Sequence, residues 1–350
     1  MKNPAAPPQH SEPTPPAAHR RRARYAGKHP RRFEDKYKEL QKNPETIAHV
    51  IASGKTPAGA HLPVMLPEVL DALRPEAGSV AVDCTLGHGG HTRGILQRIL
   101  PGGRLLALDT DPLELPRTEA ALRAEGFGED VLLTRKSNFA GLPAALAASG
   151  ISRADVILAD LGVSSMQLDN PARGFTMKSA GPLDMRMNPA RGLAASQWLE
   201  RVRPAELEAT LADNADEPDA PLLARILAGG TFLTTTDLAA AIRNALPNRL
   251  PLEREKAVRR VFQAVRIAVN EEFSALEALL RALPLCLNPG GRVAILSFHS
   301  GEDRRVKKAF QTAFREGRFT AISQDVIRAS PDECRANPRA TPAKLRWARI

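Results

Sequence analysis

The stretch VDCTLGHGGHTRGIL, residues 82–96, decides the fold class of this chain. It reads as the end of a buried strand, then a glycine cluster, then the start of a helix. Gly87, Gly89 and Gly90 can adopt backbone conformations that are closed to other residues, and they leave no side chain between the loop and a ligand. We therefore expect a nucleotide-like cofactor to bind closely against this loop.

The segments around the loop predict a parallel sheet covered by helices. From residue 79 onward, strand-like and helix-like pieces alternate, and repeated βα units produce parallel strands. The expected strands are SVAVDC, GRLLALD, DVLLTRKS, ADVILADLG, GGRVAILSFHS and KLRWARI. Most are continuous apolar runs, as expected where both faces of a sheet are buried. The predicted fold class is α/β.

The alternation stops after Gly162, where several helix-like segments follow. We expect a helical insertion at 168–252, within a sheet domain made of 59–167 and 253–350. Apolar residues at spacings of three and four predict one long helix from about Leu252 to Leu280, whose apolar face should return the chain to the sheet.

Composition excludes several classes of protein. The 350 residues carry a net charge of +10, and the three cysteines, Cys84, Cys286 and Cys334, are too far apart in sequence for a disulfide framework or a metal site. No stretch is apolar enough to span a bilayer, and no secretory signal is evident. We expect a cytoplasmic protein without a membrane partner or a bound metal; the oligomeric state stays open, a homodimer included.

Residues 1–58 form a basic N-terminal arm. The proline-rich residues 1–18 have little to bury and should be disordered. The segment HRRRARYAGKHPRRFEDKYK, residues 19–38, interleaves Arg and Lys with Tyr25, Phe33 and Tyr37. Such a pattern suits phosphates and stacked bases. A solvated tail, or an arm packed on its own domain, fits the same residues equally well.

The residues beside the glycine loop favour one cofactor. Asp109 ends the next strand, where acidic residues meet ribose hydroxyls. An NAD fingerprint would need glycine at position 92, where the chain has Thr92, and no phosphate-loop Gly-Lys-Ser/Thr follows the glycines. S-adenosylmethionine has no phosphates and needs only close backbone approach and a ribose acceptor. The loop histidines, His88 and His91, lack further residues at metal-ligand spacing.

Two later strands also end in polar residues. Asp160 lies at the expected carboxyl edge, where it could accept a hydrogen bond from a substrate amine or the cofactor and favour the positive charge of a sulfonium; a cap for the next turn is the alternative. Gln167 follows it. The segment SFHSGEDRR brings four residues near the same edge, either facing substrate or ending the strand structurally: Ser297, His299, Asp303 and Arg304. A serine hydrolase would need a G-x-S-x-G elbow, which is missing.

The start of the insertion is basic and rich in turns. NPARGFTMKSAGPLDMRMNPARG, residues 170–192, sets Arg173, Lys178, Arg186 and Arg191 among glycines and prolines. Such an edge suits a phosphate backbone. An ordinary solvated loop is the competing interpretation.

Several strings together resemble the ribosomal RNA small subunit methyltransferase H family, the bacterial cytidine N4-methyltransferases. The resemblance runs in order from about residue 61 to the end, and its strings include DCTLGHGGHT (83–92), LADLGVSSMQLD (158–169), GPLDMRM (181–187) and SFHSGEDR (297–304). GPLDMRM and SFHS are far more specific than the glycine loop. It implies a class I S-adenosylmethionine-dependent methyltransferase sheet, Rossmann-like, interrupted by a helical substrate domain.

The resemblance also implies site residues and a substrate. The implied cofactor contacts are Gly89, Gly90, His91, Asp109, Phe139, Asp160 and Gln167. The implied target is the exocyclic amine of a cytidine in the decoding region of small-subunit ribosomal RNA, so the partner would be that RNA or the small ribosomal subunit. We expect Asp160 or the adjacent backbone carbonyl to be the hydrogen-bond acceptor for the amine, with His299 as the second candidate. A stacking aromatic would be Phe298 or Phe175.

Three departures from the family pattern fall on the expected substrate side. Gly301 stands where leucine is usual, NADEP (214–218) replaces a YGEE-like element, and KAVRRVFQ (256–263) replaces an HPATRTFQ-like one. A methyltransferase with another RNA target, or a non-catalytic RNA-binding assembly factor, therefore stays as an alternative. An NAD-dependent oxidoreductase is disfavoured by Thr92.

Overall fold

The computed structural model describes residues 63–164, 167–168 and 170–350. The expectations for the basic arm, residues 1–58, lie outside the described residues.

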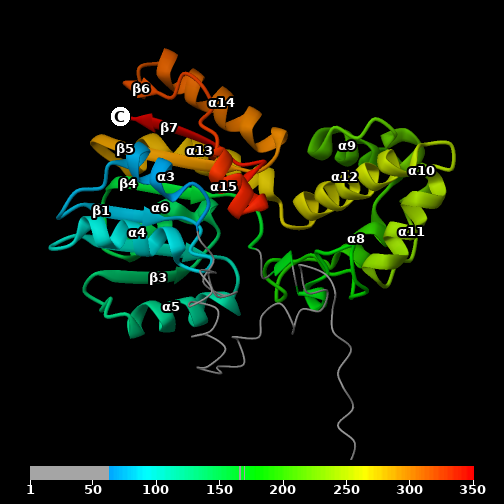
Figure 1. Cartoon of the computed structure of the whole chain (residues 1–350), viewed down its shortest axis with the longest axis horizontal. Coiled ribbons are helices and arrows are strands. Elements are labelled where there is room, and N and C mark those ends of the chain that lie inside the picture. Colours follow the sequence, from blue (N-terminus) through cyan, green and yellow to red (C-terminus); the bar gives the residue numbers. More distant parts are fainter. Residues whose placement is uncertain (1–62, 165–166, 169) are drawn as a thin grey trace, which may run out of the picture.

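A seven-stranded sheet is the centre of the fold (Figure 1). Its strands are β1 (Val80–Asp83), β2 (Arg104–Asp109), β3 (Leu132–Lys136), β4 (Ala154–Asp160), β5 (Leu287–Ser297), β6 (Ala321–Ile322) and β7 (Lys344–Arg349). They lie in the order β3-β2-β1-β4-β5-β7-β6, with β1 to β5 parallel and β7 antiparallel to both of its neighbours. The ends of β1, β2 and β4 therefore meet at one carboxyl edge.

Helices cover both faces of this sheet, as the apolar strands predict. They are α3 (Leu66–Leu73), α4 (Gly90–Ile99), α5 (Glu114–Ala124), α6 (Leu142–Ala148), α13 (Glu272–Cys286), α14 (Ser300–Arg315) and α15 (Pro331–Ala336), with short 3-10 turns at Phe139–Gly141, Pro171–Arg173 and Pro338–Ala340. Successive residues of β1 show the two faces: Ala81 packs with the core under α3 and α4, and Val82 with the core under α6, α13 and α14.

Five helices form a second unit with its own core, which appears beside the sheet in Figure 1. They are α8 (Ala195–Arg201), α9 (Pro204–Ala215), α10 (Ala220–Leu227), α11 (Thr235–Ala245) and α12 (Pro251–Val269). Leu211, Ile242 and Val258 are fully buried in this core. We call α8 to α12 the helical unit.

The expectation of one long helix from Leu252 to Leu280 is wrong. The helix stops at Val269, and α13 begins at Glu272 after Glu271 adopts a left-handed φ of 52°. The break is invisible in the sequence because the apolar spacing continues across it. The apolar face of α12 packs on α9 and α11, and only α13 returns to the sheet. The expected boundary at residue 252 thus falls inside α12.

Candidate active site

The loop after β1 is anchored by a buried carboxylate. Asp83, the last residue of β1, accepts hydrogen bonds from the backbone N–H of Thr85 (3.0 Å) and from the hydroxyl of Thr92 (2.6 Å). Thr92 is completely buried in the first turn of α4. Thr92, whose presence disfavours an NAD fingerprint, therefore bonds the start of α4 to the end of β1. The sequence did not reveal this role.

The glycines of this loop are required by its geometry. Gly87 and Gly89 have φ values of 48° and 72°, a region that favours glycine. A Cβ on Gly89 would lie only 3.0 Å from the Thr118 side chain and 3.1 Å from that of Leu122, both on α5. Gly90, the first residue of α4, packs similarly against Pro63. The loop can therefore lie close to the ends of β1 and β2.

Asp109, at the end of β2, fits a ribose. One carboxylate oxygen accepts the N–H of Gly87 and the other accepts the N–H of Asp111, both at 2.8 Å. Burial raises the pKa of Asp109 to about 6, although these two backbone hydrogen bonds oppose the shift. Each oxygen keeps a second lone pair, so the half-buried group can accept two further hydroxyl donors.

Asp160, at the end of β4, has one carboxylate oxygen that accepts no hydrogen bond from any described residue. Its Oδ2 lies 3.5 Å from Nδ1 of His91, whose Nε2 lies 2.9 Å from the carbonyl of Val64. Its Oδ1 is buried and has no hydrogen-bond partner in the described part of the chain. Burial raises the pKa of Asp160 to about 6, with His91 opposing the shift. A buried oxygen without a donor is costly, so this position suits a donor from a ligand.

Asp111 was not singled out from the sequence, yet it is the most connected residue of the site. It is 1% exposed, and its Oδ2 accepts hydrogen bonds from Gln167 Nε2 (2.7 Å) and Arg173 Nη1 (2.8 Å). Its Oδ1 accepts the N–H of Leu113 (2.9 Å) at the start of α5. The string Asp-Pro-Leu-Glu, an N-terminal capping pattern, was the signal that could have identified it.

The other two implied cofactor contacts lie at the same edge. Gln167 is buried, and its side-chain oxygen accepts the N–H of Ser164 (2.9 Å). Phe139 follows β3, which pairs with β2 up to Asp109, and the N–H of Ser137 donates to the Asp109 carbonyl (2.9 Å). The structure therefore brings the implied contacts together around the ends of β1 to β4.

The expected substrate-binding arginines of the insertion form hydrogen bonds and ion pairs with other residues of the chain. Arg173 donates to Asp111 and to the carbonyls of Arg186 (3.1 Å) and Met187 (2.9 Å), and only 10% of its side chain is exposed. Arg186 forms a two-pronged ion pair with Asp184 at 2.8 and 2.7 Å.

The expected substrate residues after β5 are engaged too. Ser297 is 2% exposed and lies within the sheet, and Asp303 pairs with Arg346 of β7 at 2.7 Å. Arg304 forms a two-pronged pair with Asp216, which belongs to the NADEP segment. Asp216 follows α9, so this pair joins the helical unit to α14.

His299 is the N-cap residue that precedes α14, and its ring is buried. Both of its ring nitrogens are buried, Nε2 lies 3.1 Å from Glu302 Oε1, and the ring packs on Phe273 with centroids 5.7 Å apart. A Cβ on Gly301 would lie 2.8 Å from the Phe273 ring and 3.2 Å from His299, which explains the glycine at this position.

The two candidate stacking aromatics differ in their surroundings. Phe175 is 6% exposed and belongs to the core of the helical unit. Phe298 is half-buried, and its ring would lie 3.9 Å from a Cβ at position 162, two residues beyond Asp160. Phe298 is therefore the aromatic that lies beside the site.

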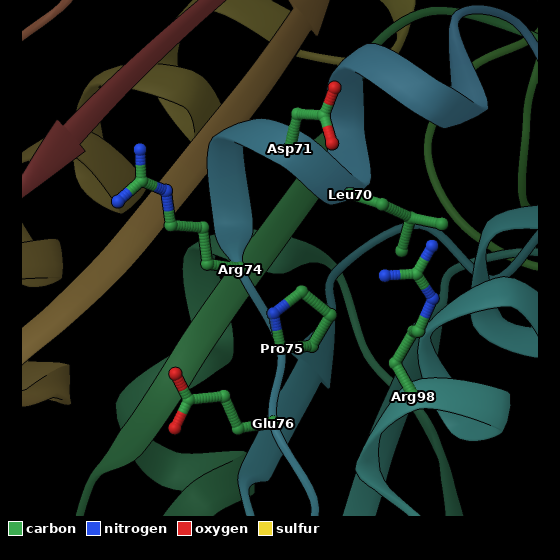
Figure 2. A pocket seen from close by; sticks show the side chains of 6 residues that line it. All are labelled: Leu70, Asp71, Arg74, Pro75, Glu76 and Arg98. Atoms are coloured by element: carbon green, nitrogen blue, oxygen red, sulfur yellow. The ribbon is translucent and has the colours of Figure 1, made fainter.

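A separate hollow lies away from this edge (Figure 2). It measures about 490 Å³ and is lined by the end of α3, the segment before β1 and Arg98 of α4. Asp71 and Glu76 share it with Arg74 and Arg98, and the labelled side chains do not converge on a common point. Because it lies before the start of β1 and contains none of the expected site residues, it is not the candidate active site.

The comparisons with known proteins identify the family of this chain. Residues 58–350 match the sequence profile of the MraW methylase family. The chain belongs to this family. A ribosomal RNA small subunit methyltransferase H 2 from Alkaliphilus metalliredigens is 47% identical, and a methyltransferase H 1 from Agathobacter rectalis is 45% identical; each match covers 94% of this chain and 97% of the relative. An rRNA methylase structure from Streptococcus thermophilus aligns over 81% of this chain and 92% of its own, with a TM-score of 0.38 and 10% identity.

Membership in the MraW methylase family confirms the predicted fold class and cofactor. The sheet is that of a class I methyltransferase, and S-adenosylmethionine is the methyl donor. Asp109 has two remaining acceptor positions, and one oxygen of Asp160 has no partner in the ranges that the structure describes, so the two residues fit a ribose and a donor group beside it. Among the described residues, no group of side chains could hold a metal ion, and no helix is long and apolar enough to cross a membrane.

Proposed function

We propose that this protein methylates the exocyclic N4 amine of a cytidine in small-subunit (16S) ribosomal RNA, in its decoding region. The observation that carries the proposal is the buried Oδ1 of Asp160, which has no hydrogen-bond partner among the described residues and lies at the same carboxyl edge as Asp109, the expected ribose acceptor. The names of the 47% and 45% identical relatives support the RNA class. The sequence resemblance supports cytidine as the modified base and N4 as the methylated atom.

The chemistry requires a hydrogen-bond acceptor near the amine. Bound S-adenosylmethionine supplies an electrophilic methyl group on a positively charged sulfur. The lone pair of a cytosine amine is delocalised into the ring, so the protein must hold the nitrogen in line and accept one of its hydrogens. The new N–C bond forms as the C–S bond breaks, and the amine loses one proton. We assign the acceptor to Asp160 or the adjacent backbone carbonyl.

The buried nitrogens of His299 favour a positioning role over proton acceptance. The imidazole packs between Phe273 and Glu302, so it supports the segment that carries Phe298. Phe298, beside Gly162, would stack on a cytosine that is flipped out of its helix.

We expect the RNA-contacting cations of the insertion to be those without an ion pair to any described residue. Lys178 and Arg191 are exposed in the 170–192 segment and form no ion pair with any residue that the structure describes. We propose that these two contact RNA phosphates, whereas the paired Arg173, Arg186 and Arg304 hold the segment and the helical unit in place. The insertion at 168–252, together with the rest of α12, would then be the RNA-recognition part.

The basic arm belongs to the same proposal. The matches to the 47% and 45% identical relatives cover 94% of the chain, which is more than residues 58–350 alone can supply. The arm is thus partly shared with these relatives. Its Arg, Lys and aromatic residues suit single-stranded RNA.

One experiment tests the function. The protein is incubated with labelled S-adenosylmethionine and small ribosomal subunits, or their RNA, from a strain that lacks this methylation, and the modified nucleoside is mapped by mass spectrometry. We expect N4-methylcytidine at one position and no transfer by a folded Asp160→Ala variant. Methylation of another base would refute the substrate, and binding of RNA without any transfer would favour the assembly-factor alternative.

A further inference from the structure

Asp111 connects the cofactor edge to the insertion. Its backbone N–H donates to Asp109, the ribose acceptor, and its carboxylate receives Gln167 and Arg173. Arg173 lies 62 positions away in the sequence, in the first turn of the insertion. The 1% exposure of Asp111 excludes water, so this pair is much less screened than a surface ion pair.

The contacts continue from Arg173 into the 170–192 segment. Its guanidinium also donates to the carbonyls of Arg186 and Met187. The N–H of Met187 donates to the side chain of Asn270 (2.7 Å), whose amide donates to the Met185 carbonyl (2.8 Å). Asn270 follows α12 directly and is one of the two residues, with Glu271, that separate α12 from α13. A continuous set of hydrogen bonds therefore runs from the loop after β2 to the base of the helical unit.

We propose that the Asp111–Arg173 pair couples cofactor binding to RNA binding. A ribose held by Asp109 orders the loop between β2 and α5, and that loop presents Asp111 to Arg173. Arg173 then holds the 170–192 segment in the arrangement that receives RNA. A ligand that orders shared structure reduces the ordering cost of the second ligand, so each ligand tightens the binding of the other by the same factor. This inference rests on the proposed function.

The test measures this factor. The dissociation constant of a small-subunit RNA fragment is determined with and without saturating S-adenosylhomocysteine, and that of S-adenosylhomocysteine with and without the RNA. We expect the wild-type protein to show the same tightening in both directions, about 5- to 10-fold. In Asp111→Asn and Arg173→Met the factor should fall to about one, and the double variant should equal the single ones.

Two controls separate coupling from general damage. Arg249→Met removes a two-pronged ion pair with Asp219 inside the helical unit and should keep the wild-type factor. Arg173→Lys keeps a cation opposite Asp111 and should retain part of the coupling factor. Thermal unfolding checks that each variant folds. Undiminished coupling in both single variants, or none in the wild type, overturns the inference while the proposed function stands. A wild type that binds no RNA overturns both.

Discussion

At the scale of single residues, the candidate site contains two carboxylates that burial makes less acidic than usual. Asp109 and Asp160 end strands on either side of β1, and the pKa of each is raised to about 6. Asp83 adds to the rise at both, Asp111 adds to it at Asp109 and Glu302 at Asp160, while His91 opposes it at Asp160. Both groups are best suited to the cofactor when ionised, because only then do they accept hydrogen bonds through both oxygens and offset the sulfonium charge.

Cofactor affinity should therefore depend on pH. As pH falls below about 6, Asp109 and Asp160 become protonated, and S-adenosylmethionine binding should weaken by about tenfold per pH unit for each carboxylate that must be ionised. Calorimetric titrations between pH 5 and 8 check this. S-adenosylhomocysteine lacks the positive charge, so its affinity should change less. An affinity for S-adenosylmethionine that is constant over this range would contradict the ionised-carboxylate site.

Removing the charge of Asp160 should stabilise the ligand-free protein. A carboxyl whose pKa is higher in the folded state costs stability as pH rises through the folded pKa, so Asp160→Asn should raise the free energy of unfolding at pH 7.5 by about 1–2 kcal/mol. Methyl transfer should fall by about 100-fold or more at the same pH. Urea unfolding of both proteins tests the first effect. The stability difference should disappear near pH 4, and a variant that is less stable at pH 7.5 would argue against the buried charge.

The sequence was sufficient to predict the location of residues that lie at a strand end. The glycine loop, Asp109 and Asp160 are of this kind, and the structure brings them to one edge. The internal partners of Arg173, Asp303 and Arg304 could not be predicted, because Asp111, Arg346 and Asp216 lie 62, 43 and 88 positions away. Nothing local distinguishes an arginine with a distant carboxylate from one that faces solvent.

At the scale of elements, the contact between α13 and α14 depends on Gly301, which has no side chain. The Phe273 ring lies between His299 and the guanidinium of Arg305, which is 3.5 Å from the ring centre. Because Gly301 leaves no room for a Cβ, Gly301→Ala should cost about 1–3 kcal/mol although alanine favours helices. Thermal unfolding measures the loss.

The Phe273→Ala background provides the control for this prediction. Once the ring is removed, the cost of Gly301→Ala should fall, because only the 3.2 Å approach to His299 then opposes the helix preference of alanine. Equal costs of Gly301→Ala in both backgrounds would show that the ring is not what excludes the side chain.

The strands were predictable as elements, but the junction of α12 and α13 was not. Apolar residues keep helical spacing from Val258 to Leu280, so the periodicity contains no sign of a break. The break is accompanied by tertiary contacts: Asn270 binds the backbone at Met185 and Met187, and Arg266 forms a buried ion pair with Glu272 across it. Such contacts override local preference.

At the scale of the whole molecule, positive charge is concentrated in the arm. The first 60 residues contain twelve Lys or Arg and five Asp or Glu, a surplus of seven within the net charge of +10. Deleting residues 1–58 should weaken RNA binding and flatten its dependence on salt, since each lost phosphate contact lowers the log–log slope by about 0.7 for single strands. Fluorescence anisotropy over a range of KCl concentrations measures both.

A second variant separates charge from stacking in the arm. Replacing Tyr25, Phe33 and Tyr37 by leucine keeps the charge, so affinity should fall while the salt slope stays near that of the full chain. Cofactor affinity should be unchanged in both variants. If deleting the arm leaves the salt dependence of RNA affinity unchanged, the arm is better interpreted as a solvated tail.

The position of β7 has a consequence for how the protein is made. This strand is the last of the seven to be synthesised, yet it lies between β5 and β6 and pairs with both. Chains emerge from the ribosome N-terminus first, so the glycine loop and the helical unit can form while the edge of β5 is still open. A nascent chain interrupted before residue 344 would expose an unpaired strand edge, which invites aggregation and degradation. The protein therefore completes this sheet only after β7, at Lys344–Arg349, has been translated.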